Sequence, residues 1–298
     1  MLTDRAIAPA TLQRMRIVSL LPSATEIVCA LGLRDQLVGR SHECDFPLDV
    51  ASLPPVSLAR IAGDELSSSE IDAAVSQAIE RGEELYGIDE GVLAELAPDV
   101  IVTQSLCTVC AVSGDGVRRV ARARGIAPSV VELAPDGLEG IAESVLELGR
   151  ALGVEARARE LADDLRVRLA AAGVANRTAN PRRTVVLEWL DPPFAAGHWV
   201  PEQVELAGGI ELLGSARAPS FRTDWTAVRA AAPELVVLAP CGFDEHGTRT
   251  RMLADGVERE LAGLRATIAC VDATSHFSRP GPRVVEGVEL LARLYRDL

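Results

Sequence analysis

Residues 136–173, DGLEGIAESVLELGRALGVEARARELADDLRVRLAAAG, predict two consecutive helices. In the first, apolar residues recur at steps of three and four and share one face: Ile141, Val145, Leu148 and Leu152. Asp136 is its expected N-cap, and Gly153 is placed to end it. The second helix, Val154 to Ala172, would reach roughly 28 Å. A helix of that length either spans two lobes or covers one sheet, so the flanking sequence must decide.

The two flanks of this stretch carry similar elements in the same order. Strand-like runs before it are repeated after it: Arg16–Leu21 by Arg183–Trp189, and Leu96–Thr103 by Ala231–Leu238. Nearly all-apolar strands that alternate with helices predict parallel sheets covered on both faces. We therefore predict an α/β fold of two Rossmann-like lobes with parallel sheets, joined by a single long helix. The predicted divisions are an N-terminal lobe (15–135), a closing helix plus linker helix (136–180) and a C-terminal lobe (181–298).

The composition is that of a packed, acidic protein. The 298 residues are 48% hydrophobic and 24% charged, as in globular domains. A net charge of −13, with arginine as the only basic residue type besides histidine, argues against a nucleic-acid partner. The sequence has no run of about eighteen apolar residues that would predict a membrane span. Residues 1–14 contain neither a signal-peptide core nor a lipid-acceptor cysteine. On sequence alone we expect a cytoplasmic monomer.

Aromatic residues are scarce and gather in loops. Seven of the ten are expected in or beside loops that follow strands: Phe46, Phe194, Trp199, Phe221, Trp225, Phe243 and Phe277. In open α/β sheets such loops form the ligand site, and rigid rings supply contact area at low entropic cost. The pattern indicates a cleft for a large, partly apolar ligand. The alternative is that the rings plug the ends of the sheets.

Two further segments contain polar side chains to which we assign a role: the loop with Arg279 and the start of the first helix. Arg279, between the last strand and the last helix, is the best candidate for a charge-assisted contact with a ligand. A salt bridge within the loops is the alternative. Ser23-Ala-Thr-Glu26 predicts a capping box at the start of the first helix.

Cysteine and histidine residues suggest a second kind of site. Cys107-Thr-Val-Cys110 and His42-Glu-Cys44 each follow a predicted strand, so the four side chains could hold zinc or iron. A lone C-x-x-C pair equally suits a redox dithiol or two packed thiols. The sequence lacks the G-x-S-x-G, P-loop, H-E-x-x-H and G-x-G-x-x-G enzyme motifs. We therefore predict a non-enzymatic binding protein, with a cysteine-based metal or redox protein as the alternative.

Several motifs together resemble one known family. They are Arg16–Glu26, Gly39–Pro47, Leu96–Val102, Pro192–Gly197, Phe277–Arg279 and Pro282-Arg283. These segments resemble the cobalamin-binding proteins of ABC importers, which are class III, helical-backbone substrate-binding proteins with siderophore- and haem-binding relatives. The resemblance implies that cobalamin, another corrinoid or a similar metal chelate is held between the lobes with little closure. It also implies an ABC permease as partner and an extracytoplasmic location.

The resemblance also assigns parts of the ligand site. It implies that Pro22, Ser23 and Ala24 lie in the wall of the first lobe, and Phe194, Phe277 and Arg279 in that of the second. Histidine and tryptophan residues in the predicted loops complete the expected ligand-binding set: His42, His198, Trp199, Trp225 and His276.

Overall fold

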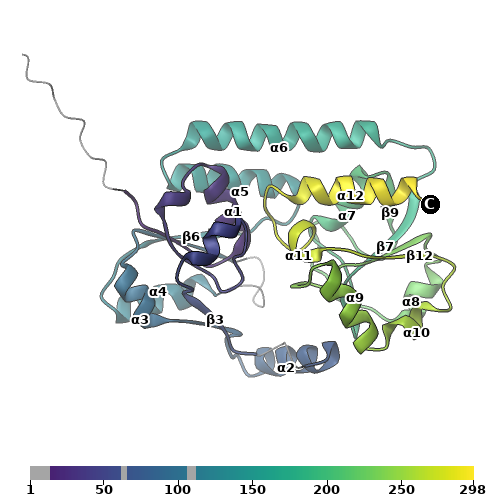
Figure 1. Ribbon diagram of the computed structural model, residues 1–298, viewed down its shortest axis with the longest axis horizontal. Coiled ribbons are helices and arrows are strands. Elements are labelled where there is room, and N and C mark those ends of the chain that lie inside the picture. Colours follow the sequence, from purple (N-terminus) through teal and green to yellow (C-terminus); the bar gives the residue numbers. More distant parts are fainter. Residues whose placement is uncertain (1–13, 62–65, 106–111) are drawn as a thin grey trace, which may run out of the picture.

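The computed structural model describes residues 14–61, 66–105 and 112–298, and it shows two α/β lobes beneath one long helix (Figure 1). The N-terminal sheet has the order β2-β1-β5-β6, and all its strands are parallel. These strands are β1 (Ile17–Ser19), β2 (Leu37–Arg40), β5 (Val100–Gln104) and β6 (Ser129–Leu133). Helices α1 (Pro22–Ala30), α3 (Glu90–Leu96), α4 (Gly114–Ala123) and α5 (Leu138–Ala151) alternate with them.

The C-terminal sheet repeats this arrangement and extends it. Its parallel centre consists of β7 (Arg182–Leu190), β11 (Leu235–Leu238) and β12 (Thr267–Cys270), with β9 (Gly209–Glu211) parallel to β7. Helices lie between the strands: α7 (Val200–Leu206), α8 (Trp225–Ala230), α9 (Glu245–Ala254), α10 (Val257–Leu261), α11 (Ala273–His276) and α12 (Val284–Arg296). The internal repeat is visible in the backbone, because Ala97 and Ala232 take the same left-handed conformation before β5 and β11. The fold-class prediction is thus confirmed.

One edge of the C-terminal sheet differs from the predicted all-parallel pattern. The short strand β8 (Pro193–Ala195) turns back antiparallel to β7, and β10 (Phe221–Arg222) pairs antiparallel with β8. Antiparallel strands need only a short turn between them, here at Asp191-Pro192. Strands of two or three residues carry too little pattern to be predicted from sequence.

The linker helix α6 (Glu155–Ala175) packs on both halves of the chain. Its buried residues are Ala158, Ala162, Leu165 and Leu169. Beneath it, α5 and α12 lie roughly end to end (Figure 1). The buried residues of α6 belong to one hydrophobic core with Val102 of β5 and Val237 of β11. This core is therefore continuous from lobe to lobe. Strand side chains alternate between this core and a separate cluster on each sheet's other face, which explains why the strands are apolar throughout. The lobe boundaries at 135/136 and 180/181 stay a prediction.

The start of α5 corrects the predicted N-cap. Gly137, not Asp136, occupies the cap position and offers no side-chain acceptor. The Leu138 N–H instead donates to Glu202 Oε2 on α7, at 2.6 Å. A carboxylate from the other lobe therefore satisfies this helix end, and a local sequence signature cannot anticipate a cap that arrives from residue 202.

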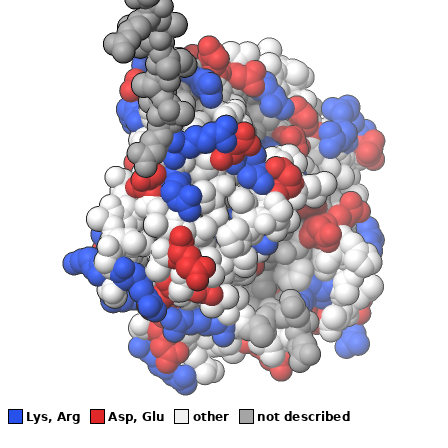
Figure 2. Space-filling model, turned by 60° about the vertical axis from the view of Figure 1, so that its left-hand side comes forward, with Lys and Arg blue, Asp and Glu red and all other residues white. Residues whose placement is uncertain are grey.

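The surface mixes both signs of charge. Arginine and acidic side chains are interspersed over the face drawn in Figure 2. Within the described ranges, no helix is both long and apolar enough to cross a bilayer.

Candidate binding cleft between the lobes

The carboxyl ends of the two sheets meet at the junction of the lobes. After β1, the chain enters α1 at Pro22 and Ser23, and Ser23 Cα lies 3.7 Å from where a Cβ on Gly281 would be. After β2, the loop containing Glu43 and Asp45 contacts Arg279. Gly281 and Arg279 both follow β12. Loops past the carboxyl ends of parallel strands form ligand sites in open α/β folds, so this junction is the candidate site.

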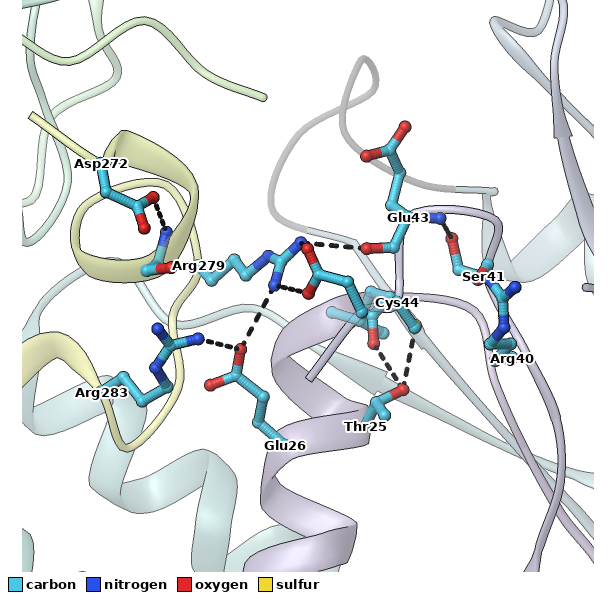
Figure 3. Close-up of polar contacts among 12 residues, drawn as sticks. Thr25, Glu26, Arg40, Ser41, Glu43, Cys44, Asp272, Arg279 and Arg283 are labelled. Carbon is cyan, nitrogen blue, oxygen red and sulfur yellow. Dashed lines mark hydrogen bonds and ion pairs between the residues drawn. The ribbon is translucent and has the colours of Figure 1, made fainter. Parts of the chain in front are cut away.

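One connection between the lobes is a partly buried ionic cluster, which we call the Arg279 cluster: Glu26, Asp45, Arg279 and Arg283. Arg279 Nη2 donates to the Glu43 carbonyl at 2.9 Å and lies 3.2 Å from Asp45 Oδ2 (Figure 3). Glu26 Oε1 lies 3.5 Å from Arg279 Nη1 and 3.6 Å from Arg283 Nη1. The side chains of Arg279 and Glu26 are only 8% and 3% exposed. Arg279 therefore forms the salt bridge that was the alternative to a ligand contact, and this bridge joins two lobes.

Glu26 is a residue of the junction whose contacts the sequence pattern did not predict. Leu21 occupies the N-cap of α1 and makes no side-chain cap, so the predicted Ser23–Glu26 capping box is wrong. The Glu26 carboxylate points to the other lobe instead. Burial raises its pKa to about 7, because loss of hydration outweighs the attraction of Arg283 and Arg279. Among the described residues, Glu26 Oε2 has no hydrogen-bond partner.

A second connection is made by α2 (Ser68–Glu80), and we call it the α2 bridge. This helix lies between β3 (Ser57–Ala59) and β4 (Tyr86–Ile88), yet it reaches the C-terminal lobe on the side opposite α6 (Figure 1). Trp189 Nε1 donates to the Ser68 carbonyl at 3.2 Å, and Arg222 Nη2 lies 2.6 Å from Asp72 Oδ2. The Ser68 N–H donates to Asp255 Oδ1 at 3.2 Å. The junction is thus tied on two sides.

Aromatic rings from both lobes lie next to these connections. In the N-terminal lobe, the His42 ring lies 5.6 Å from that of Tyr86, and His42 Nδ1 is 2.7 Å from Ser57 Oγ. In the C-terminal lobe, Trp189 and Phe243 are 6.2 Å apart. All four rings are half-buried. They offer partly open ring area in each lobe, although the Arg251 guanidinium lies over the Phe243 ring at 5.0 Å.

The other predicted ligand contacts are distributed between the junction and the interior. Pro22 and Ser23 lie at the junction, whereas Ala24 is fully buried in the core. Trp199 and Phe277 are also buried, and Trp199 Nε1 donates to the Phe277 carbonyl at 2.8 Å. The side chains of Ala24, Trp199 and Phe277 are thus packed in the core and have little surface exposed to solvent.

The remaining predicted residues lie around the C-terminal lobe. Phe194 is on β8 beneath the Arg222 guanidinium, whereas Trp225 opens α8 and packs on the lobe's own cluster. His198 stacks on Trp199, and His276 Nδ1 lies 3.6 Å from Glu286. Burial lowers the pKa of both histidines. Ligand contact by any of these residues stays a prediction.

The predicted zinc or iron site gains no support. Cys44 Sγ lies 3.0 Å from Thr25 Oγ1 and is buried, whereas His42 turns to Ser57 and Tyr86. Cys107 and Cys110 lie outside the described residues. Over the described ranges, no group of three or more His, Cys, Asp or Glu is arranged to hold a metal ion.

Two cavities lie past the strand ends, and the sequence did not single out their residues. One, of about 490 Å³, follows β5 and β6 in the N-terminal lobe and is lined in part by Tyr86, Gln104 and Glu132. The other, of about 460 Å³, lies at the start of α9 and is lined by Asp244, Glu245, His246, Arg249 and Asp272. The sequence shows only that these residues follow predicted strands. Polar residues are common in such loops, so this position alone could not identify the residues that line the cavities.

Two similar α/β lobes, a rigid connecting helix and facing strand ends define a two-lobed binding protein. Residues 17–268 match the family described as periplasmic binding protein, and the chain belongs to that family. Its members are solute-binding proteins of ABC uptake systems and are not enzymes. The predicted class is therefore confirmed.

Individual relatives extend over nearly the whole chain. The vitamin B12-binding protein of Vibrio cholerae is 23% identical over 277 residues, which are 92% of this chain and 86% of the relative. The cobalamin-binding protein of Halobacterium salinarum is 24% identical over 289 residues, 95% of this chain and 69% of the relative.

Solved structures show the same fold. The periplasmic heme-binding protein RhuT from Roseiflexus sp. RS-1 superimposes with a TM-score of 0.68 at 22% identity, covering 95% of this chain and 98% of that one. The vitamin B12-binding protein BtuF of Vibrio cholerae gives 0.61 at 21% identity, covering 95% and 96%.

Proposed function

We propose that this chain binds cobalamin or another corrinoid between its lobes and delivers it, as a monomer, to the permease of an ABC importer. The observation that carries this proposal is a pair of half-buried rings in each lobe, His42 with Tyr86 and Trp189 with Phe243. A broad, partly apolar metal chelate can stack against such rings on both of its faces. The proposed location is extracytoplasmic, as in the family, in place of the cytoplasmic expectation from sequence.

The choice of a corrinoid rests on relatives as well as on geometry. The two relatives described above carry vitamin B12 or cobalamin in their names. Heme-binding proteins share the fold at similar identity, so haem is the comparison ligand that an experiment must include.

Direct titration tests the proposal. The purified chain is titrated with cyanocobalamin and aquocobalamin, with haem and a ferric hydroxamate as comparators. Binding is followed by calorimetry and by the visible spectrum of the chelate. We expect saturable binding of one corrinoid per chain. Failure of both cobalamins to bind saturably would exclude the proposed ligand.

Variants at Trp189 separate the ring from its hydrogen bond. Trp189→Ala removes the stacking surface and should weaken cobalamin binding by roughly tenfold or more, as truncating an aromatic anchor does. Trp189→Phe keeps a ring but loses the Nε1 donor to Ser68, so its affinity should stay close to that of the parent chain. Equal affinity of all three proteins would show that the ligand does not use this ring.

A further inference from the structure

The N-terminal cavity is lined by a side-chain amide, that of Gln104. Gln104 is the last residue of β5 and lines the cavity, although it is only 8% exposed. No described residue makes a hydrogen bond to its side-chain amide. The amide lines the cavity and is therefore available to a group that enters it.

The described charged residues that line the cavity are mostly acidic, and their one arginine is already paired. Among the described lining residues, Arg118 is the one arginine, and its Nη2 lies 2.6 Å from Glu132 Oε1. Glu84 lies 2.8 Å from Arg119 Nη2 on the outer side. An incoming carboxylate would thus meet four carboxylates, of Glu83, Glu84, Asp115 and Glu132, and no unpaired guanidinium among the described lining residues.

The start of α4 is occupied as well. Gly114 is the first residue of this ten-residue helix, and a Cβ there would collide with the Glu132 carboxylate. The protein's own carboxylate therefore covers the helix N-terminus, the position at which an anionic group would otherwise be favoured. A neutral amide needs no such charge, since the Gln104 side chain can both donate to it and accept from it.

We propose that this cavity is a subsite that receives an amide-bearing arm of the ligand and rejects a carboxylate-bearing arm. The inference rests on the proposed function: the periphery of a corrin carries acetamide and propionamide arms, whereas haem carries propionates. The subsite opens on the correct edge, because β5 pairs with β1, whose following turn meets the other lobe. Gln104 with Glu132 would then discriminate corrinoids from haem.

Two kinds of probe test the subsite. In the first, cyanocobalamin is compared with its monocarboxylic acids, in which one amide has become a carboxylate. We expect one of these acids to bind about tenfold more weakly than cyanocobalamin, and Glu132→Gln to reduce that difference. Gln104→Leu should weaken cyanocobalamin binding by about tenfold. The exposed Gln77→Leu on α2 is the matched control and should change nothing. Thermal denaturation checks that each variant is folded.

The second probe does not require cobalamin. Propionamide and propionate are added separately while the side-chain amide of Gln104 is observed by NMR. We expect a saturable shift with propionamide and none with propionate. If the chain binds cobalamin but Gln104→Leu binds equally well and propionamide causes no shift, the subsite is overturned and the proposed function stands. If cobalamin fails to bind but propionamide still shifts Gln104, the proposed function falls and the amide subsite is supported.

Discussion

Arg279 is the residue on which the contact between the lobes most depends. Replacing it by alanine would leave Glu26 buried at the junction with one remaining guanidinium contact, to Arg283 at 3.6 Å. Removing one partner of a buried ion pair typically costs about 3–5 kcal/mol. We therefore expect Arg279→Ala to lower the free energy of unfolding by that order in chemical denaturation. Arg159→Ala, which breaks an exposed pair with Glu155, should stay within about 0.5 kcal/mol.

Glu26 makes the stability of the folded chain depend on pH, and the direction of this dependence follows from its raised pKa. Its pKa in the folded chain is raised from the ordinary 4.5 to about 7, so between these values the folded state holds more protons than the unfolded state. Stability should therefore fall as pH rises through this window. Glu26→Gln should flatten the slope by about one proton, or about 1.4 kcal/mol per pH unit, in denaturation series at several pH values.

The matched control for this pH series is Glu139→Gln. Arg166 lowers the pKa of Glu139, so this residue affects the pH dependence of stability only below the window of Glu26. Its replacement should therefore leave the slope of stability against pH unchanged within that window. Glu211, buried and with a pKa also raised to about 7, keeps its own contribution in every variant. An unaltered slope in Glu26→Gln would show that Glu26 is ionised throughout the window.

For single residues, the sequence indicated the candidate side chains more clearly than it indicated what each one contacts. Arg279 stood out because it lies between the last strand and the last helix. The salt bridge named as its alternative role is present, and its contact with a ligand stays a prediction. Glu26 was interpreted as part of a capping box because of its spacing from Ser23. Its actual partners, Arg279 and Arg283, lie 253 and 257 residues further along the chain. Gln104 carried no pattern at all. Its significance comes from a cavity that exists only in the folded chain.

Among the elements, α5 and α6 approach each other unusually closely at Gly149. A Cβ there would collide with the methyl group of Ala158, which is itself fully buried. We expect Gly149→Ala to destabilise the protein by about 1–3 kcal/mol, as overpacking does. Gly91→Ala, on the exposed side of α3, should instead be neutral or stabilising by up to about 1 kcal/mol. Thermal and chemical denaturation of the pair would check this, and equal effects would contradict close packing at Gly149.

The α2 bridge should be separable from global stability. Asp255→Ala removes the acceptor for both the N–H and the hydroxyl of Ser68. We expect amides in α2 to exchange with deuterium about tenfold faster, while those in β5 and β11 keep their rates. Glu260→Ala, which breaks a pair with Arg229 inside the C-terminal lobe, is the control and should leave α2 unaffected. Unchanged exchange in Asp255→Ala would mean that the helix is held by other contacts.

The order of elements was predictable where patterns were long. The apolar runs that became β1, β5, β7 and β11, and the helices α5 and α6, were all anticipated from periodicity. The antiparallel strand β8 was not, since three residues define no period. The docking of α2 was not anticipated either, because its contacts with Asp255 and Arg222 depend on tertiary placement.

For the molecule as a whole, the architecture predicts a cleft of nearly constant width. A continuous helix resists bending more than loop crossovers do, and the Arg279 cluster and the α2 bridge tie the lobes on two sides. In small-angle scattering we expect a radius of gyration of roughly 19 Å, changing by less than about 1 Å on ligand addition. A contraction of several ångströms would refute this.

The two connections between the lobes also determine an order of events during folding. The Arg279 cluster joins residues 234 and 253 positions apart, and the α2 bridge joins residues 187 positions apart. Contacts between such distant segments close the largest loops, so they form after the local strand and helix pairs of each lobe. The chain is made from its N-terminus, and the first lobe must wait for residue 279 before Glu26 meets a guanidinium from the second. We therefore expect the junction between the lobes to assemble last, after both lobes have acquired their sheets.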